Sequence, residues 1–246
     1  MNIIFLKTIH IIKHLPDLKK TAGVIAMCLL QLIATAQKNK IVIVDVRALY
    51  GSNELALDSN YLNGAGEELK FETFRFYISN LRLAMNDSVT WQEKESYHLY
   101  DRAVEKNSFT LTVPGTIRFN TFTFDLGIDS LTNVSGAMGG DLDPTKGMYW
   151  TWQSGYINFK LEGKNHQCQN PKKEFQYHVG GYQKPFDALR TVSLATGPKD
   201  KVVIGFDVKQ FLRSTEPGKQ DHIMSPGAAA VKLSLAAVSC FSLLQP

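Results

Sequence analysis

The sequence predicts an all-β protein: a single antiparallel β-sandwich domain with Greek-key character over residues 40–246, with at most one or two short helices. Segments in which apolar and polar residues alternate recur along the chain, with turn residues between them. Aromatic residues, which strands favour, make up 11% of the chain and include 14 Phe and 9 Tyr. Helical spacing is scarce, and strands without intervening helices are typical of a sandwich or barrel.

Eight segments have the two-residue alternation expected of strands. They span residues 41–49, 74–83, 109–113, 117–124, 157–161, 175–179, 192–194 and 202–208. In the second of them the apolar phase shifts between Ile78 and Leu81, which predicts a bulge or short turn at Asn80. The Ser-Pro pair at 225–226 resembles a helix N-cap followed by proline, so we expect a short helix over 228–235 and then a closing strand.

Residues 1–36 are predicted to be a signal peptide that is removed on export. Lys19 and Lys20 precede an apolar run that ends in Ala-Thr-Ala at Ala36, the small-x-small pattern of a cleavage site. The run is shorter than the roughly 20 residues that a bilayer span needs, and no later segment is long and apolar enough to span a membrane. We therefore expect a periplasmic or secreted protein; a buried core helix is the alternative interpretation of the run.

The charge of the mature chain is nearly balanced. Beyond residue 36 there are 23 basic and 22 acidic residues. Proteins that bind nucleic acid need a net basic surface, because binding depends on neutralising phosphates. The composition therefore argues against nucleic acid as the main partner.

Two cysteines, Cys168 and Cys240, remain once Cys28 is removed with the predicted signal peptide. Export permits a disulfide between them. Two cysteines so far apart in the sequence can equally stay free, so both alternatives remain open. There is no CxxC motif and no Cys–His spacing typical of a zinc site.

The common catalytic motifs are absent from the sequence. It has no GxSxG nucleophile elbow, P-loop, HExxH zinc motif or dinucleotide-binding glycine pattern. The glycine-rich stretch 136–140 is expected to be a surface loop. Asp141 and Asp143 begin like a calcium loop, but the closing glutamate is missing, so a turn is expected there. We predict a protein that is not an enzyme.

Trp150 and Trp152 form the most unusual local feature, within GMYWTWQSGYI at 147–157. Two residues apart on a strand, they would share one face. A pair of core anchors is the simplest interpretation, because tryptophan buries a large area and needs one partner for its N–H. A stacking platform for a sugar and a site of oxidative modification beside a metal are the alternatives.

Histidines are the best candidates for metal ligands in the mature chain. His178 lies on the strand face opposite Phe175 and Tyr177, so it either meets solvent or lines a site. His222 stands two residues before Met224, and imidazole with a nearby thioether suits copper. His98 and His166 carry no local motif. Histidines from separate strands can form a site that no local spacing reveals.

Several stretches together resemble the MbnP family of exported copper-binding proteins, in the form common among Bacteroidota. The tryptophan segment is the most specific of them, and the others occur in order over nearly the whole mature chain, from about Ile41 to Pro246. The matching stretches are residues 74–81, 97–99, 124–130, 140–144, 147–157, 160–163 and 175–181.

The resemblance implies a β-rich, non-enzymatic protein for copper scavenging or handling. It also implies a partner di-haem enzyme that converts a tryptophan to kynurenine, which then helps to ligate the copper ion. By this resemblance His178 is the foremost copper ligand, with His98 and His222 behind it. Trp150 or Trp152 is the residue to be modified.

The chain departs from the resemblance at its end. Many Bacteroidota members of the family close with a histidine-bearing tail, whereas residues 239–246 contain no histidine. Copper binding is therefore expected to be weakened, altered or lost relative to the family. The alternative function is an extracellular binding or adhesion module without a metal.

Overall fold

A computed structural model describes residues 38–63, 66–152, 155–197, 199–216 and 218–245. The predicted signal peptide, with Cys28 and the cleavage site at Ala36, lies outside these residues. Within them, no helix is long and apolar enough to cross a membrane. Residues 40–113 and 117–246 form one compact unit.

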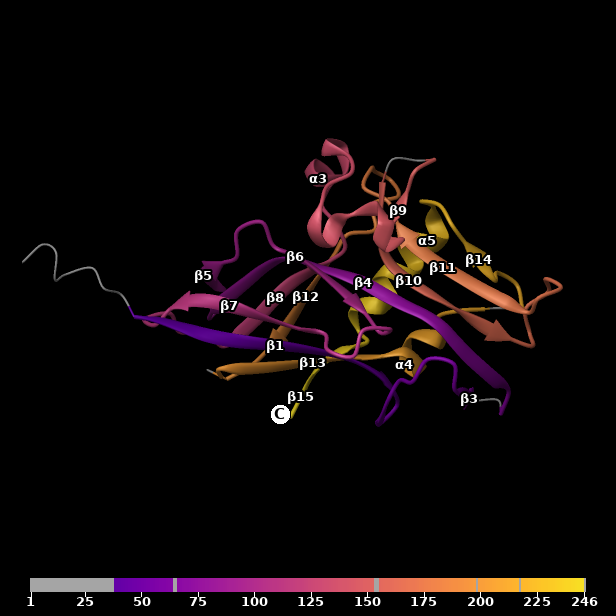
Figure 1. Cartoon of the computed structure of the whole chain (residues 1–246), viewed down its shortest axis with the longest axis horizontal. Coiled ribbons are helices and arrows are strands. Elements are labelled where there is room, and N and C mark those ends of the chain that lie inside the picture. The colour runs from indigo at the N-terminus through magenta and orange to yellow at the C-terminus, as the bar shows by residue number, and fades with distance from the viewer. Residues whose placement is uncertain (1–37, 64–65, 153–154, 198, 217, 246) are drawn as a thin grey trace, which may run out of the picture. The chain divides into compact units, whose positions relative to one another are not determined.

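Two sheets build this unit (Figure 1). In the smaller sheet the order is β15 (Phe241–Leu244), β13 (Lys201–Asp207), β1 (Asn39–Tyr50) and β2 (Asn53–Glu54), and β7 (Ser108–Pro114) also pairs with β1. In the larger sheet the order is β12 (Arg190–Ala195), β8 (Thr121–Leu126), β4 (Glu68–Met85), β10 (Gly155–Asn165), β11 (Glu174–Gly180) and β14 (His222–Ile223). Four short strands extend it: β3 (Asn60–Leu62), β5 (Ser88–Gln92) and β6 (Tyr97–Asp101) pair with β4, and β9 (Tyr149–Trp150) pairs with β10.

The prediction of an all-β sandwich is confirmed, with two corrections. First, β1 pairs with β13 and β11 pairs with β14 in parallel, so the sheets are not purely antiparallel. Second, the described residues contain three α-helices rather than one or two: α3 (Ser130–Ser135), α4 (Val208–Leu212) and α5 (Ala228–Val238). The first two are too short to show helical periodicity, and the side chains of Asp129 and Asp207 cap them.

The phase shift in β4 corresponds to a real break in the strand. Asn80 has a φ of 49°, and the pairing of β4 with β8 shifts register between Ser79 and Arg82. The extra residue turns the following apolar side chains back toward the same core. The predicted bulge or short turn at Asn80 is confirmed.

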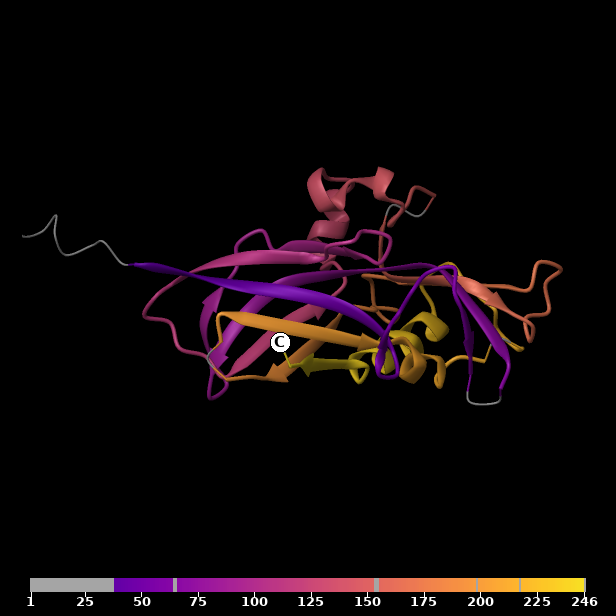
Figure 2. The same cartoon turned by 60° about the horizontal axis from the view of Figure 1, so that its bottom comes forward.

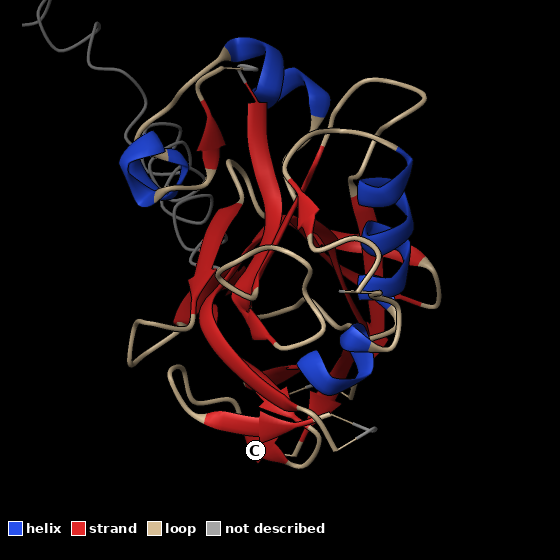
Figure 3. Cartoon of the chain, turned by 90° about the vertical axis from the view of Figure 1, so that its right-hand side faces the viewer, coloured by secondary structure: helices blue, strands red, loops and turns tan. Residues whose placement is uncertain are grey.

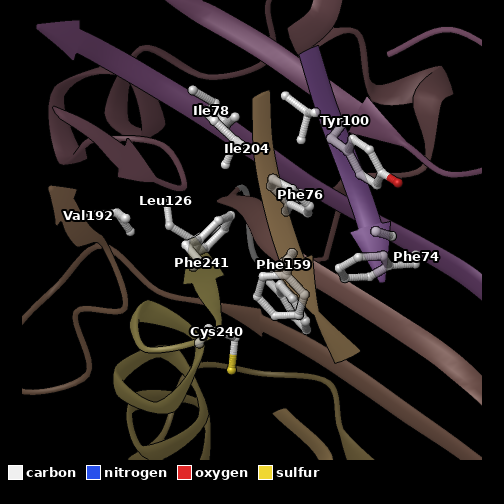
Figure 4. Close-up of a cluster of buried hydrophobic side chains, with 14 of the residues drawn as sticks. Phe74, Phe76, Ile78, Tyr100, Leu126, Phe159, Val192, Ile204, Cys240 and Phe241 are labelled. Atoms are coloured by element: carbon white, nitrogen blue, oxygen red, sulfur yellow. The ribbon is translucent and has the colours of Figure 1, made fainter. Parts of the chain in front are cut away.

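The main core lies between the two sheets and is rich in aromatic rings. Phe206 of β13 contacts Phe74 of β4, Phe159 of β10 and Phe241 of β15, with ring centroids 5.1, 5.4 and 4.9 Å away. Figure 4 shows Phe74, Phe76, Phe159 and Phe241 gathered with Ile204 in this region. The helices lie around the outside of the strands (Figure 3), and α5 contributes three buried residues to the core.

The opposite surface of the larger sheet, here called the outer face, carries a second buried cluster. A cover segment, residues 127–152, supplies four of its apolar side chains over Tyr77 of β4 and Tyr156 of β10: Ile128, Leu142, Met148 and Trp150. This segment includes α3, β9 and two 3-10 turns, Gly140–Leu142 and Pro144–Lys146, and in Figure 2 it stands off one side of the strands. The hydroxyl of Tyr77 donates to the carbonyl of Asp141 at 3.0 Å, which fixes the cover segment to the sheet.

Both cysteines of the described chain are buried and free. Burial raises the pKa of the Cys168 thiol to about 11 and that of Cys240 to about 12. Of the two alternatives left open by the sequence, the structure has unpaired thiols, and they stay protonated at neutral pH.

Candidate functional site

His178 lies on the outer face of the larger sheet. It is opposite Lys160 in β10, and Lys160 is opposite Arg75 in β4. Residues opposite each other in a ladder share a face, so His178 is on the side away from the main core, as its alternation predicts. That side is not open to solvent, however, since the His178 side chain is only 7% exposed.

Glu162 of β10 fixes the orientation of the His178 ring. The Nε2 atom of His178 is 2.7 Å from Oε1 of Glu162. Burial alone raises the pKa of Glu162, but hydrogen bonds from His178 and Thr73 and the charge of Lys160 outweigh this and hold it at about 2. An ionised carboxylate can only accept, so Nε2 carries a proton, and in the neutral imidazole the lone pair is then on Nδ1. Nδ1 is buried and has no hydrogen-bond partner among the described residues.

Glu162→Gln is expected to cost stability in a pH-dependent way. The pKa of Glu162 in the folded protein, about 2, is below the ordinary value of 4.5, so the carboxylate stabilises the fold above pH 4.5. This contribution is lost as the pH falls from 4.5 towards 2. Urea unfolding across this range should therefore show a deficit for the variant at neutral pH that vanishes in acid. Glu105→Gln, at an exposed position, is the charge-matched control. A deficit independent of pH would contradict the assigned role of the carboxylate.

Trp150 lies beside His178 on the same face. Gly180 is two residues after His178 in β11, so their Cα atoms are about 6.6 Å apart along the strand. The Trp150 ring packs on Gly180: a Cβ built there would lie 2.8 Å from Cζ3 of Trp150 and 2.7 Å from the carbonyl oxygen of Tyr156. Trp150 is 4% exposed, and its Nε1 is a second buried nitrogen without a partner in the described structure.

Trp152 does not share the burial of Trp150. It is 64% exposed and lies in a turn after β9, while its ring centroid is 5.8 Å from that of Trp150. The interpretation of the two tryptophans as paired core anchors therefore holds for Trp150 alone. A strand only two residues long ends before Trp152, which removes the shared face expected from alternation.

His222 reaches the outer face from the neighbouring strand. It is opposite Gln176 in the parallel pairing of β14 with β11, and Gln176 shares its face with His178. Its Nδ1 is 2.8 Å from Oδ1 of Asp221, and its side chain is 41% exposed. Hydrogen bonds from His222 and Asn170 lower the pKa of Asp221 to about 2, so this histidine also has a carboxylate partner.

His98 is on the other side of the sheet. It is opposite Ile78 in the pairing of β6 with β4, and Ile78 belongs to the main core. Its ring stacks on Phe109 with centroids 3.6 Å apart, and its Nε2 is 2.8 Å from Oε2 of Glu93. The thickness of the sheet separates His98 from His178, so the structure does not bring them together.

The described residues contain no group of three or more His, Cys, Asp or Glu side chains that could hold a metal ion. The outer face instead offers the lone pair of His178 beside Trp150, with His222 at its rim. The sequence interpretation missed Glu162, which orients His178, and Gly180, on which Trp150 packs. Pairing the segments 157–161 and 175–179 as a hairpin would have found Glu162, since the hairpin sets it diagonally beside His178.

Comparison with known proteins agrees with this fold. No curated protein gives a significant match. Among solved structures, MbnP from Methylosinus trichosporium is similar with a TM-score of 0.55 and 13% identity, over 79% of this chain and 87% of that one. At this identity the likeness shows a shared fold. The model of the MbnP family matches residues 39–225, well over half of the sequence, and the chain therefore belongs to the MbnP family.

Proposed function

We propose that this protein is an exported, non-enzymatic copper-binding protein that scavenges or handles copper. In this proposal His178 is the central ligand, and Trp150 is oxidised to kynurenine by a partner di-haem enzyme. One observation carries the proposal: His178 Nδ1 and Trp150 Nε1 are both buried without partners on one face of the sheet. Unpaired buried polar atoms are costly, so their presence together points to a missing ligand.

His178 suits copper by its chemistry. Its Nδ1 keeps a lone pair because Glu162 holds the proton on the other nitrogen, and metal-binding histidines commonly have such a carboxylate partner. Imidazole nitrogen is a good donor for copper, and Cu(II) stands at the top of the divalent affinity order. The outer face of the sheet therefore presents one oriented nitrogen donor.

Trp150 is the better of the two tryptophans for modification. An indole nitrogen is only a donor and offers no lone pair to a metal. Opening the ring to kynurenine turns that nitrogen into an aryl amine and adds a ketone, so the atom that lacks a partner becomes a ligand. Trp150 lies on Gly180 beside His178, whereas most of the Trp152 side chain faces solvent.

His222 is the second imidazole donor in this proposal. It shares the outer face with His178, and its Nδ1 is held by Asp221, which leaves Nε2 available at the rim. His98 is left out because it lies on the opposite face. Two imidazoles and an aryl amine provide three nitrogen donors without any histidine from the C-terminal tail.

His178→Ala and His178→Gln are expected to abolish stoichiometric copper. The Ala variant leaves a cavity at a buried position, so the Gln variant, which retains an N–H donor, keeps the experiment interpretable if the first is unstable. Elemental analysis of protein purified from its own host measures the copper, and circular dichroism checks the fold. His166→Ala, at an exposed histidine, is the matched control. Full copper occupancy in both His178 variants would contradict the assignment.

A binding or adhesion module without a metal is the second candidate function. The exposed ring of Trp152 favours it, together with the exposed side chains of Leu131, Val134 and Met138 in the cover segment. Intact mass and metal content of the wild-type protein separate the two candidates. Absence of both copper and a modified tryptophan would favour the module.

A further inference from the structure

The rings of Trp150 and Trp152 connect the buried cluster of the outer face with the surface. Their ring centroids are 5.8 Å apart and their planes are inclined by 47°. Trp150 is 4% exposed and Trp152 is 64% exposed. Among the described residues, Trp152 is the only aromatic ring in such contact with Trp150. Of this ring pair, the indole of Trp150 is buried and that of Trp152 faces solvent.

We propose that Trp152 is the surface relay through which electrons leave Trp150. The inference rests on the proposed function, because it names how an oxidant that stays outside the protein reaches a buried residue. A macromolecular oxidant cannot touch the buried ring of Trp150, but it can touch the exposed ring of Trp152. Electron transfer slows steeply with distance, so two short steps through Trp152 are faster than one long step past it.

The relay transfers electrons and makes or breaks no bond. In each passage the oxidant gains one electron from Trp152, and Trp152 regains one from Trp150, so that Trp152 ends unchanged. Four such electron transfers remove the four electrons that must leave the Trp150 indole to give N-formylkynurenine. With a haem peroxidase as oxidant, two hydrogen peroxide molecules are consumed, the ring gains two oxygen atoms, and two waters are released. Hydrolysis by one further water then gives kynurenine and formate.

The polarity of the two surroundings is consistent with this assignment. Trp150 belongs to an apolar cluster with Met148, Tyr156 and Ile157, and Gly180 lies under its ring. Trp152 and the preceding Thr151 are exposed in the turn after β9. An external oxidant therefore meets Trp152 first, while the product forms at Trp150, next to His178.

Photo-oxidation of the purified protein tests the relay without the partner enzyme. A photogenerated ruthenium(III) polypyridyl complex is a one-electron oxidant too bulky to reach Trp150 directly. Tandem mass spectrometry of the peptide that carries both tryptophans then locates oxidation at each position. Trp152→Phe removes the relay but keeps an aromatic ring, and Trp91→Phe removes the third tryptophan of the chain as the matched control. Acrylamide quenching of Trp150 fluorescence checks that Trp150 stays buried.

Oxidation at Trp150 is expected to fall severalfold in Trp152→Phe and to match the wild type in Trp91→Phe. An unchanged or increased yield at Trp150 in Trp152→Phe overturns the relay. The proposed function is tested separately by protein from the native host. Native protein without kynurenine overturns the proposed modification, while the photo-oxidation result still decides whether Trp152 conducts electrons to the surface.

Discussion

Phe206→Ala is expected to lower the free energy of unfolding by about 3–5 kcal/mol, the usual cost of deleting a fully buried phenylalanine. Phe206 is 0% exposed and contacts five other rings: Phe74, Phe76, Phe159, Phe211 and Phe241. These rings come from both sheets and from α4, so the substitution leaves a cavity between the two sheets. Since whole domains are stable by only about 5–15 kcal/mol, the variant should be close to unfolding at room temperature.

Denaturant unfolding followed by circular dichroism measures this loss. Phe186→Ala is the matched control, because Phe186 is 41% exposed and its removal should change stability by no more than about 0.5 kcal/mol. Equal stabilities of the two variants would contradict the central place of Phe206 in the core.

Gly180→Ala is expected to drive Trp150 away from His178. The new methyl group would lie 2.8 Å from Cζ3 of Trp150 and 2.7 Å from the carbonyl oxygen of Tyr156. One of these contacts is with backbone, so the strand cannot relieve it by a rotamer change. Overpacking of this kind costs about 1–3 kcal/mol. Under the proposed function, the displaced ring also leaves the copper site, and both copper and the modification at Trp150 should be lost.

The emission of Trp150, in a background with Trp91 and Trp152 replaced by Phe, reports the displacement. A red shift and stronger acrylamide quenching are expected for Gly180→Ala. Gly139→Ala is the control, because a Cβ there meets nothing within 4 Å and Gly139 has a φ of −92°. Unchanged emission and copper content in Gly180→Ala would show that Trp150 does not depend on the space above Gly180.

Most of the strands could be predicted from sequence because burial on one side imposes alternation. The run 41–49 lies within β1, and its buried side chains alternate through Val42, Val44 and Val46. The expected helix over 228–235 corresponds to α5, which continues to Val238. Asn80 was located by the phase shift alone. These features are local, so a single segment carries enough information to specify each one.

The site depends on pairing between distant strands, which alternation does not reveal. Whether His98 and His178 meet is decided by the register of β6, β4, β10 and β11, and this register sets them on opposite faces. The burial of His178 could not be predicted either, because alternation indicates only which face of a strand a residue is on and not what lies over that face. The role of Gly180 depends on what packs above it, which only the folded arrangement specifies.

The parallel pairing of β1 with β13 has a consequence for how the chain folds. Ile43 is opposite Lys201, and β15 then adds to the far side of β13, so the smaller sheet is built from segments far apart in the sequence. Such non-local pairing requires closure of a long loop, and the entropy lost in this closure is offset only after the strand contacts have formed. Chains of this kind fold in milliseconds to seconds. Until residues 201–207 are available, the edge of β1 that pairs with β13 remains open. A growing or truncated chain that ends before β13 is therefore prone to aggregation, and chaperones that bind extended apolar segments should recognise β1 first.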